Sequence, residues 1–272
     1  MTMLQIDHLT RDYGGGKGIF DVTFGVDEGE VFGFLGPNGA GKTTTIRHLM
    51  GFIRPKKGTC RINNKDCWTA RADIQRDLGY IPGEINFFDD MTGKEFLRFM
   101  TKYRHIPAQN RQKELLERFE LNPKGKIKKM SKGMKQKLGI VAAFMHDPQV
   151  LILDEPTSGL DPLMQHRFID LIAEEKARGK TILLSSHIFE EVERTCDRIG
   201  IIRQGKMADI DSVDNLRSRH LRTYTVQLDT PELAEHFAAD FSGTCEGTRV
   251  TVTARQDLES IFLHYYGGND HD

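Results

Sequence analysis

The stretch of sequence that decides the fold of this chain is Gly36-Pro37-Asn38-Gly39-Ala40-Gly41-Lys42-Thr43. It matches the pattern G-x-x-x-x-G-K-[ST], which is typical of a loop that binds phosphate. Its glycines allow the loop to curl so that successive backbone N–H groups point at phosphate oxygens, because side chains would block that approach. Lys42 can bring a positive charge to the β- and γ-phosphates, and the Thr43 hydroxyl can bind magnesium. The alternative is an ordinary glycine-rich turn that precedes a lysine.

The sequence on either side of this loop favours phosphate binding. Residues 31–35, Val-Phe-Gly-Phe-Leu, form a nearly continuous apolar run, as expected of a buried strand. Residues 43–50 have the pattern of a helix, and Gly51 closes it. A strand, a glycine loop and a helix are the context that a phosphate loop needs, and the helix adds its positive end to the same point. We therefore predict that this stretch, together with Thr44, binds the phosphates of a nucleoside triphosphate.

A second apolar strand ends in two carboxylates. Residues 150–153, Val-Leu-Ile-Leu, lead directly into Asp154 and Glu155. The carboxyl end of a buried strand is where an α/β sheet places its ligands. Asp154 can hold magnesium there through water, and Glu155 is the natural general base to polarise the attacking water. Adjacent carboxylates are often only a solvated strand end, but the apolar run and the upstream loop favour a site that cleaves the nucleotide.

Two further side chains are candidates for the same site. His187 follows the apolar strand 181–184 and a pair of serines, so it is predicted at the same sheet edge, where it can contact the γ-phosphate. The alternative is a structural or merely exposed histidine. Tyr13 is predicted in a loop before the second strand, where it can stack on an adenine ring. The alternative is a loop tyrosine packed on the surface.

Size and composition set the class of protein. The 272 residues suffice for one large domain, or for one domain and a small appendage. Lys and Arg number 38 and Asp and Glu 39, so the net charge gives no argument for nucleic acid or a membrane surface as partner. No apolar run approaches the ~20 residues that span a bilayer, and residues 1–7 do not resemble a signal peptide. The cysteines form no C-x-x-C pair, which favours free thiols in a reducing cytosol: Cys60, Cys67, Cys196 and Cys245.

The order of patterns along the chain predicts an α/β fold. Residues 4–8 and 20–35 are predicted as short strands, and 90–145 as a helical insertion with apolar residues at helical spacing. After it, strands and helices alternate, which implies a mainly parallel sheet covered on both faces. A closing hairpin is predicted around Gln204-Gly205. A domain boundary is predicted near Ser218, followed by a small α/β appendage with a strand at 223–228, a helix at 231–241, a strand at 248–254 and a last helix at 257–266.

The combined series of motifs resembles the nucleotide-binding domain of an ATP-binding cassette (ABC) transporter over about residues 4–210. Besides the phosphate loop, residues 130–136 resemble the signature motif, 153–157 the second nucleotide strand, 158–162 the D-loop and 186–187 the switch histidine. No simple phosphate-loop kinase or GTPase carries this series. The resemblance implies a P-loop cassette at 1–217 with a mainly parallel sheet core, N-terminal antiparallel strands and a helical subdomain at about 90–145, and the appendage at 218–272.

The resemblance also implies a mechanism. In the family, two cassettes face each other head to tail and trap two ATP molecules with Mg²⁺. Ser131 and Gly133 would contact the γ-phosphate held by the partner chain, and Ser131 is itself a plausible N-cap for the helix that follows. A homodimer is expected, with a membrane permease on a separate chain, which would hold this protein peripherally on the inner face of the membrane. No nucleic-acid partner is expected.

The sequence departs from the family pattern at two places. Lys132 and Met134 replace the first glycine and the glutamine of the common Leu-Ser-Gly-Gly-Gln signature. Gly83 stands where the family has a glutamine that senses magnesium and γ-phosphate, and Glu84 substitutes for it or the contact is missing. A lysine-rich run at 124–137 is interpreted as a solvated face that also attracts phosphates, with a nucleic-acid patch as the alternative.

Three functional hypotheses remain at this point. The signature variant and the appendage look like the bacterial subgroup that exports drugs, antimicrobial peptides or polysaccharides, so the leading hypothesis is the Mg-dependent ATPase subunit of an exporter. An importer subunit is the first alternative, because importers and exporters share the same ATPase. The second is a soluble cassette ATPase acting on ribosomes or DNA, which a single cassette without a long coiled-coil insertion disfavours.

Overall fold

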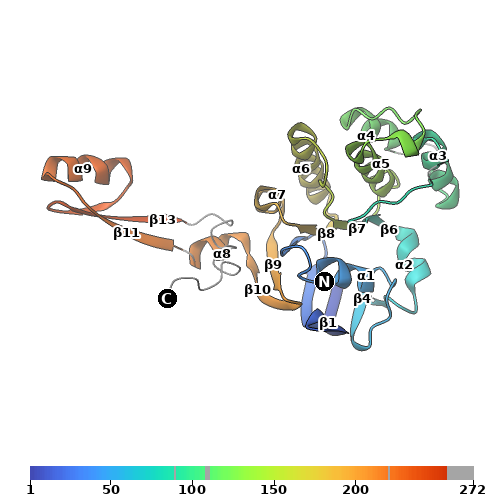
Figure 1. Ribbon diagram of the computed structural model, residues 1–272, viewed down its shortest axis with the longest axis horizontal. Coiled ribbons are helices and arrows are strands. Elements are labelled where there is room, and N and C mark those ends of the chain that lie inside the picture. Colours follow the sequence, from blue (N-terminus) through green and yellow to red (C-terminus); the bar gives the residue numbers. More distant parts are fainter. Residues whose placement is uncertain (89, 108–110, 220, 256–272) are drawn as a thin grey trace. The chain divides into compact units, whose positions relative to one another are not determined.

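A six-stranded sheet forms the centre of the fold. The computed structural model describes residues 1–88, 90–107, 111–219 and 221–255 (Figure 1). The strands lie in the order β10-β9-β3-β8-β7-β6, and the pairs β9–β3–β8–β7–β6 are parallel. Their bounds are β3 Val31–Leu35, β6 Leu78–Ile81, β7 Val150–Asp154, β8 Thr181–Ser186, β9 Arg198–Arg203 and β10 Lys206–Ser212. Every residue of β3, β7 and β8 is buried, which confirms the mainly parallel core.

A second, antiparallel sheet is formed mainly by the N-terminal residues, as predicted. Its order is β2-β1-β4-β5, with β1 Thr2–Gly14, β2 Lys17–Asp27, β4 Lys57–Ile62 and β5 Lys65–Asp66. The prediction of Tyr13 in a loop is wrong: it lies in β1. The β1–β2 pairing continues through Asp12↔Gly18 to Gly14↔Lys17. A turn as tight as this needs left-handed backbone, which Gly15 and Gly16 supply with φ of 60° and 74°.

Helix α1, Lys42–Leu49, lies between the two sheets and follows the phosphate loop. Its Ile46 and Leu49 share one core with Val22 of the antiparallel sheet and with Phe34 and Ile152 of the parallel sheet. The other helices of this unit outside the insertion are α2 Arg71–Asp77, α6 Pro162–Ala177 and α7 Phe189–Thr195. The phosphate loop is therefore held between two rigid layers.

The predicted helical insertion is confirmed. It contains α3 Gly93–Tyr103, α4 Gln112–Arg118, a short 3₁₀ turn Ile127–Lys129 and α5 Lys132–Phe144, which group together beside α6 (Figure 1). Thr92 begins α3 with a capping box, in which its hydroxyl accepts from the Glu95 N–H and the Glu95 carboxylate accepts from the Thr92 N–H. The insertion is thus a set of helices attached to the sheet between β6 and β7, and its first helix begins at its own capping box.

The chain divides into two compact units, Met1–Ile210 and Asp211–Asp272. The second contains α8 Val213–Arg219, β11 Leu221–Gln227, α9 Pro231–Asp240, β12 Thr244–Glu246 and β13 Arg249–Arg255. Its antiparallel sheet has the order β11-β13-β12. The strands and helix at 223–254 match the expected appendage, whereas α8 was not expected. The domain boundary near Ser218 stays a prediction. The predicted helix at 257–266 lies outside the described residues.

All four cysteines are free thiols. Burial raises the pKa of the Cys60 and Cys196 thiols to about 12, so they remain neutral and pack as small apolar groups. None of the helices in the described ranges is long and apolar enough to cross a membrane.

Candidate functional site

Three strand ends meet at one edge of the parallel sheet. Leu35 of β3 pairs with Ser186 of β8, and Ser185 of β8 pairs with Asp154 of β7. Because these strands run parallel and in register, the segments that follow them leave the sheet side by side. The phosphate loop, the carboxylates and the histidine are therefore brought to the same edge, as the sequence predicted.

The glycines of the phosphate loop are required by close contacts and by backbone conformation. A Cβ on Gly36 would lie 2.7 Å from the carbonyl oxygen of Ile202. Gly41 has φ of 115°, and a Cβ there would lie 2.7 Å from Cγ2 of Ile19. The loop is also tied to the β9–β10 hairpin, whose Gly205 N–H donates to the Ala40 carbonyl at 2.9 Å. Larger residues at these positions would displace the loop from its support.

Lys42 is 4% exposed, and its ammonium is satisfied within the chain. It donates to the carbonyl oxygens of Gly36 at 2.5 Å and Pro37 at 3.2 Å. Its Nζ also lies 3.3 Å from Oε1 of Glu155. A buried ammonium needs partners of this kind. The loop thus holds a cation against the strand that carries the candidate general base.

Asp154 presents an unpartnered oxygen at this edge. Its Oδ1 accepts from the Ser185 hydroxyl at 2.5 Å, whereas Oδ2 is buried without a hydrogen-bond partner among the described residues. A carboxylate oxygen of this kind fits a divalent cation, because hard cations prefer oxygen ligands. A Cβ on Gly83 would lie 3.1 Å from the same oxygen, so the family's glutamine position is beside it. Glu84 is exposed, and its substitution for that glutamine stays a prediction.

Glu155 has a backbone that non-glycine residues adopt rarely, with φ of 48°. Its N–H donates to the carbonyl oxygen of Ser185 at 3.1 Å, which holds this turn against β8. Its carboxylate lies between the Lys42 ammonium and the His187 ring, with Oε1 3.3 Å from Nζ of Lys42 and Oε2 3.5 Å from Nδ1 of His187. The predicted base and the predicted switch histidine are therefore in contact.

Tyr13 is half-exposed on β1, and the Arg11 guanidinium lies 5.2 Å from the centre of its ring. An exposed aromatic ring beside a cation can stack on a purine. Its role with adenine stays a prediction.

The signature segment is built around the start of α5. The Met134 N–H donates to the Ser131 hydroxyl at 3.2 Å, which confirms Ser131 as the N-cap. Gly133 is a glycine for a steric reason within the chain, because a Cβ there would lie 2.7 Å from the Gly159 carbonyl oxygen. Among the described residues, no hydrogen bond or ion pair joins Ser131 or Gly133 to the phosphate loop.

Two side chains bind the signature segment to the D-loop and to the residue Pro156 that precedes it, and sequence reasoning did not assign them this role. Lys132 donates to the Ser158 hydroxyl at 2.9 Å. The buried amide of Gln136 donates to the Pro156 carbonyl at 2.6 Å. The only signal in the sequence was that Lys132 replaces a glycine of the common signature. Ser185 was also missed, although its place at a strand end beside Asp154 follows from the parallel pairing.

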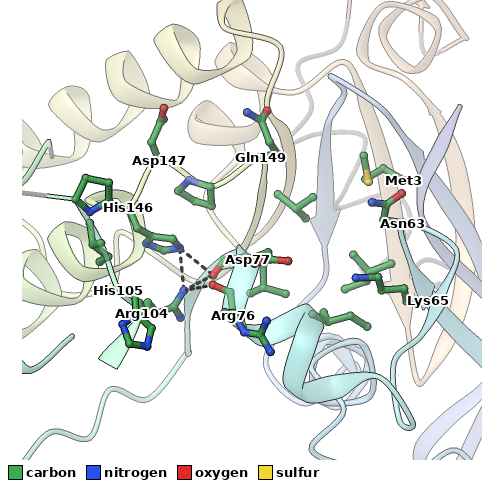
Figure 2. Close-up of a pocket in the computed structure, with 17 residues that line it drawn as sticks. Met3, Asn63, Lys65, Arg76, Asp77, Arg104, His105, His146, Asp147 and Gln149 are labelled. Carbon is green, nitrogen blue, oxygen red and sulfur yellow. Dashed lines mark hydrogen bonds between the residues drawn. The ribbon is translucent and has the colours of Figure 1, made fainter. Parts of the chain in front are cut away.

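A separate hollow lies elsewhere in this unit. A cavity of about 460 Å³ is found where β6 and β7 begin, at Leu78 and Val150, so the length of both strands separates it from Asp154 (Figure 2). Arg104 donates to the Leu78 carbonyl at 2.9 Å and to Nε2 of His146 at 2.8 Å. Burial lowers the pKa of His146 to about 4, so the ring is neutral at pH 7. None of the nucleotide-site residues lines this cavity.

A phosphate loop between a buried strand and a helix, with carboxylates at a neighbouring strand end, defines a phosphate-loop nucleoside triphosphatase. Comparison with known proteins narrows the class. The family model described as ABC transporter matches residues 19–158. The chain belongs to the ABC transporter family, and it is an ATPase subunit of an ABC transporter. This confirms the family and the fold that the motifs predicted.

Three relatives illustrate the match. The chain is 39% identical to the bacitracin transport ATP-binding protein BcrA of Bacillus licheniformis, over 84% of this chain and 75% of that protein. It is 36% identical to the linearmycin resistance ATP-binding protein LnrL of Bacillus subtilis (strain 168), over 92% and 82%. A solved ATP-binding subunit of an ABC transporter is similar with a TM-score of 0.73 and 35% identity, over 80% of this chain and 93% of that one.

One structural neighbour bears on assembly. The dimeric ABC transporter cassette MJ0796 is similar with a TM-score of 0.70 and 23% identity, over 78% of this chain and 99% of that one, which supports the fold alone. The dimer is a property of that cassette.

Proposed function

We propose that this chain powers export through a separate membrane permease, and that two copies clamp two ATP molecules between them. The observation that carries this proposal is the separation of two finished half-sites. One is the phosphate loop with Asp154, Glu155 and His187. The other is the signature segment with Ser131, at the N-terminal end of α5. A helix start favours an anion, and within the part of the chain that the structure describes no hydrogen bond or ion pair joins this one to the phosphate loop of the same chain. A head-to-tail dimer supplies each half-site with its complement.

The phosphate half-site has a role for each residue. Lys42 exchanges the carbonyls of Gly36 and Pro37 for the β- and γ-phosphate oxygens, which hold a cation more strongly. The backbone N–H groups of the loop and the start of α1 bind the same phosphates. Thr43 and Asp154 would hold Mg²⁺, which neutralises charge developing on the phosphates. Tyr13 stacks on the adenine.

The hydrolysis step uses Glu155 and His187. Glu155 accepts a proton from water as the water oxygen bonds to the γ-phosphorus and the bond to the bridging β–γ oxygen breaks, giving ADP and phosphate. His187 binds the γ-phosphate and, through its contact with Glu155, orients the base. The left-handed backbone of Glu155 turns its carboxylate toward both Lys42 and His187.

Mixing two inactive variants tests the composite site. Lys42→Ala removes the phosphate half, and Ser131→Arg blocks the signature half with a bulky side chain. In a mixed dimer one site carries both defects and the other carries neither. We expect the mixture to regain about a quarter of wild-type ATP turnover, because half of randomly formed dimers are mixed and each has one intact site.

The controls make that result specific. Each variant alone should have little turnover, and Ser131→Arg should bind ATP as a monomer but fail to dimerise in sedimentation experiments. Asn122→Arg, an exposed change on the segment leading to α5, should keep wild-type turnover and should dimerise normally. No recovery in the mixture, with both variants folded, would contradict the composite site.

An exposed aromatic surface supports the separate permease. Phe88, Phe99 and Tyr103 are 56%, 40% and 72% exposed and form a row, in which Phe88 meets Phe99 edge to face at 5.8 Å between ring centres and Phe99 stacks on Tyr103 at 5.9 Å. Beside Tyr103 is a hollow of about 400 Å³ lined by residues of α2 and of the end of α3. Large exposed aromatics beside a groove are typical of a protein-binding surface. We assign it to a cytoplasmic segment of the permease.

Site-specific crosslinking tests this surface. In its native host, Tyr103→Cys carrying a short crosslinker should capture a polytopic membrane protein. Lys113→Cys on α4, whose native side chain is 90% exposed, is the matched control and should capture none. Equal capture at both positions would contradict docking at the aromatic row.

Export as the direction rests on the relatives. Two of them are named for bacitracin transport and linearmycin resistance, and another is named a Nod factor export ATP-binding protein. Deleting the gene should raise the host's susceptibility to bacitracin or linearmycin. Loss of nutrient uptake with unchanged susceptibility would favour an importer.

A further inference from the structure

Glu191 is a buried carboxyl that the assigned chemistry does not use. It lies on α7, two per cent exposed. Its Oε2 accepts from the hydroxyls of Ser186 at 2.6 Å and Thr157 at 3.3 Å. Its Oε1 is buried without a hydrogen-bond partner among the described residues. Burying a carboxyl is costly unless all of its oxygens are hydrogen-bonded, and within the described ranges one oxygen of Glu191 is not. A functional role would explain why the residue is placed here.

One of these hydrogen bonds reaches the segment of His187. The Ser186 hydroxyl donates to Glu191, and the same oxygen accepts from the Ile188 N–H at 2.9 Å. The residues before and after His187 are therefore joined through one hydroxyl whose direction Glu191 sets. The histidine is held from both sides while its own ring stays half-exposed and free to reach a ligand.

The other hydrogen bond reaches the segment of Glu155. Thr157 follows Glu155 by two residues, in a turn closed by the Ser158 N–H donating to the Glu155 carbonyl at 3.1 Å. Thr157 and Glu191 also line a small cavity of about 100 Å³ with Gln165, His166 and Ile188. The one carboxyl thus binds both the segment of the base and the segment of the histidine, whose side chains meet 3.5 Å apart.

Glu191 is itself firmly supported. Its backbone carbonyl accepts from the Thr195 hydroxyl at 2.6 Å. The next residue, Val192, packs on β3 so closely that a Cβ on Gly33 would lie 2.5 Å from its Cγ1. Helix α7 therefore holds Glu191 at a fixed place relative to β3, the strand that leads into the phosphate loop.

We propose that Glu191 is a positioning residue for ATP hydrolysis. It joins the segments that carry Glu155 and His187, and so sets the distance between the Glu155 carboxylate and the His187 ring. The inference rests on the roles proposed above for Glu155 and His187. Glu191 acts through these two residues and does not touch the nucleotide. A small displacement of a reacting group costs about 10- to 100-fold in rate, so the effect on turnover is large.

Four variants test the proposal by kcat and KM for ATP. Glu191→Ala should lower kcat about 10- to 100-fold with KM for ATP changed less than about threefold. Glu191→Gln should restore most of that turnover, because its amide oxygen accepts from the same two hydroxyls. Thr157→Val, which removes one hydroxyl and keeps the shape, should lose part of it. Glu193→Ala on the same helix is the matched control and should turn over as wild type.

The His187→Ala background separates positioning from general damage. If Glu191 acts through His187, then Glu191→Ala should cost much less turnover in that background than alone. Equal losses in both backgrounds would mean a purely structural role and would overturn the inference. If Glu191→Ala and Thr157→Val both turn over as wild type while His187→Ala is impaired, the inference about Glu191 is overturned and the proposed site stands. Wild-type turnover of His187→Ala would overturn the proposed site as well.

Discussion

The two functional regions of this chain differ in how they are completed. At the edge of the parallel sheet, residues distant in sequence already touch: Lys42 lies against Glu155, and Glu155 against His187. At the start of α5, Ser131 caps its own helix, and the segment is bound through Lys132 to Ser158 of the D-loop and through Gln136 to Pro156 just before it. The first region is assembled by folding. The second is held in place by folding and, in the proposed dimer, receives its ligand from the partner copy.

The difference lies in what each region can satisfy alone. The ammonium of Lys42 has carbonyl and carboxylate partners in the free chain, so the phosphate half is stable before nucleotide arrives. The first N–H groups of α5 have the Ser131 hydroxyl as their side-chain cap. In the dimer proposed above, an anion bound by a second copy would meet this helix start. Under that proposal, folding and association share the construction of the ATP site.

The largest expected effect comes from breaking the folded region at its base. Glu155→Gln should lower ATP turnover about 10²- to 10³-fold, because the amide cannot accept the proton of water. ATP binding should persist, and the protein should accumulate as a dimer when ATP is added, measured by sedimentation and phosphate release. Glu28→Gln, an exposed change, is the control. Wild-type turnover in Glu155→Gln would place the base elsewhere.

Removing the cation of the same region should affect binding. Lys42→Ala should weaken ATP binding about 100-fold, since charge-assisted hydrogen bonds to the β- and γ-phosphates are lost. Titration calorimetry measures this, with Lys57→Ala on exposed β4 as the control. Because Lys42 also neutralises Glu155, the variant should be less stable as well. Unchanged affinity would defeat the phosphate-loop assignment.

The buried carboxyl of Glu191, which supports the Glu155 and His187 segments, should affect how the free energy of unfolding depends on pH. Burial, with a smaller contribution from the nearby Glu155, raises the pKa of Glu191 from its ordinary 4.5 to about 7, although the hydrogen bonds from Ser186 and Thr157 oppose the shift. Between these values the native chain holds a proton that the unfolded chain has released. The free energy of unfolding therefore falls as pH rises through this window, and the loss is complete above the native pKa.

Glu191→Gln should remove that dependence. The stability of the variant relative to wild type should rise between pH 4.5 and pH 8 by on the order of 2 kcal/mol, measured by urea unfolding. Other buried groups contribute in the opposite sense: His146, with a pKa of about 4, favours the native state as pH rises. Comparing the two proteins at each pH cancels that contribution. A constant difference across the range would mean that Glu191 is ionised throughout.

The smallest expected effect sharpens the picture of the second region. Lys132 is exposed and Ser158 only partly buried, so their hydrogen bond should contribute no more than about 1 kcal/mol. A double-mutant cycle of Lys132→Met and Ser158→Ala should show a coupling energy of that size in unfolding experiments. Turnover should suffer more than stability, because the pair aligns signature and D-loop. Additive effects on both quantities would mean that the contact has no function.

The elements that sequence predicted well are those with a strong local signal. The phosphate loop, the apolar strands ending at Leu35 and Asp154, and the helical insertion all follow from glycine spacing, apolar runs or helical periodicity. The seven-residue helices α2 and α8 were not predicted, because two turns carry little periodicity. Tyr13 was misplaced in a loop, because consecutive glycines did not reveal how far the β1–β2 pairing continues.

By itself, the sequence determined the chemistry of this protein: a loop that binds phosphate, two carboxylates at a strand end, and a signature segment on a helix start. These depend on residues adjacent in the chain, whose types and spacing fix the local backbone. Only the tertiary structure decided that Ser185 would hold Asp154, that Lys132 would hold Ser158, and that Glu191 would join the base and the histidine. Such contacts join segments distant in sequence, and strand register and helix packing, which no local pattern encodes, bring them within bonding distance.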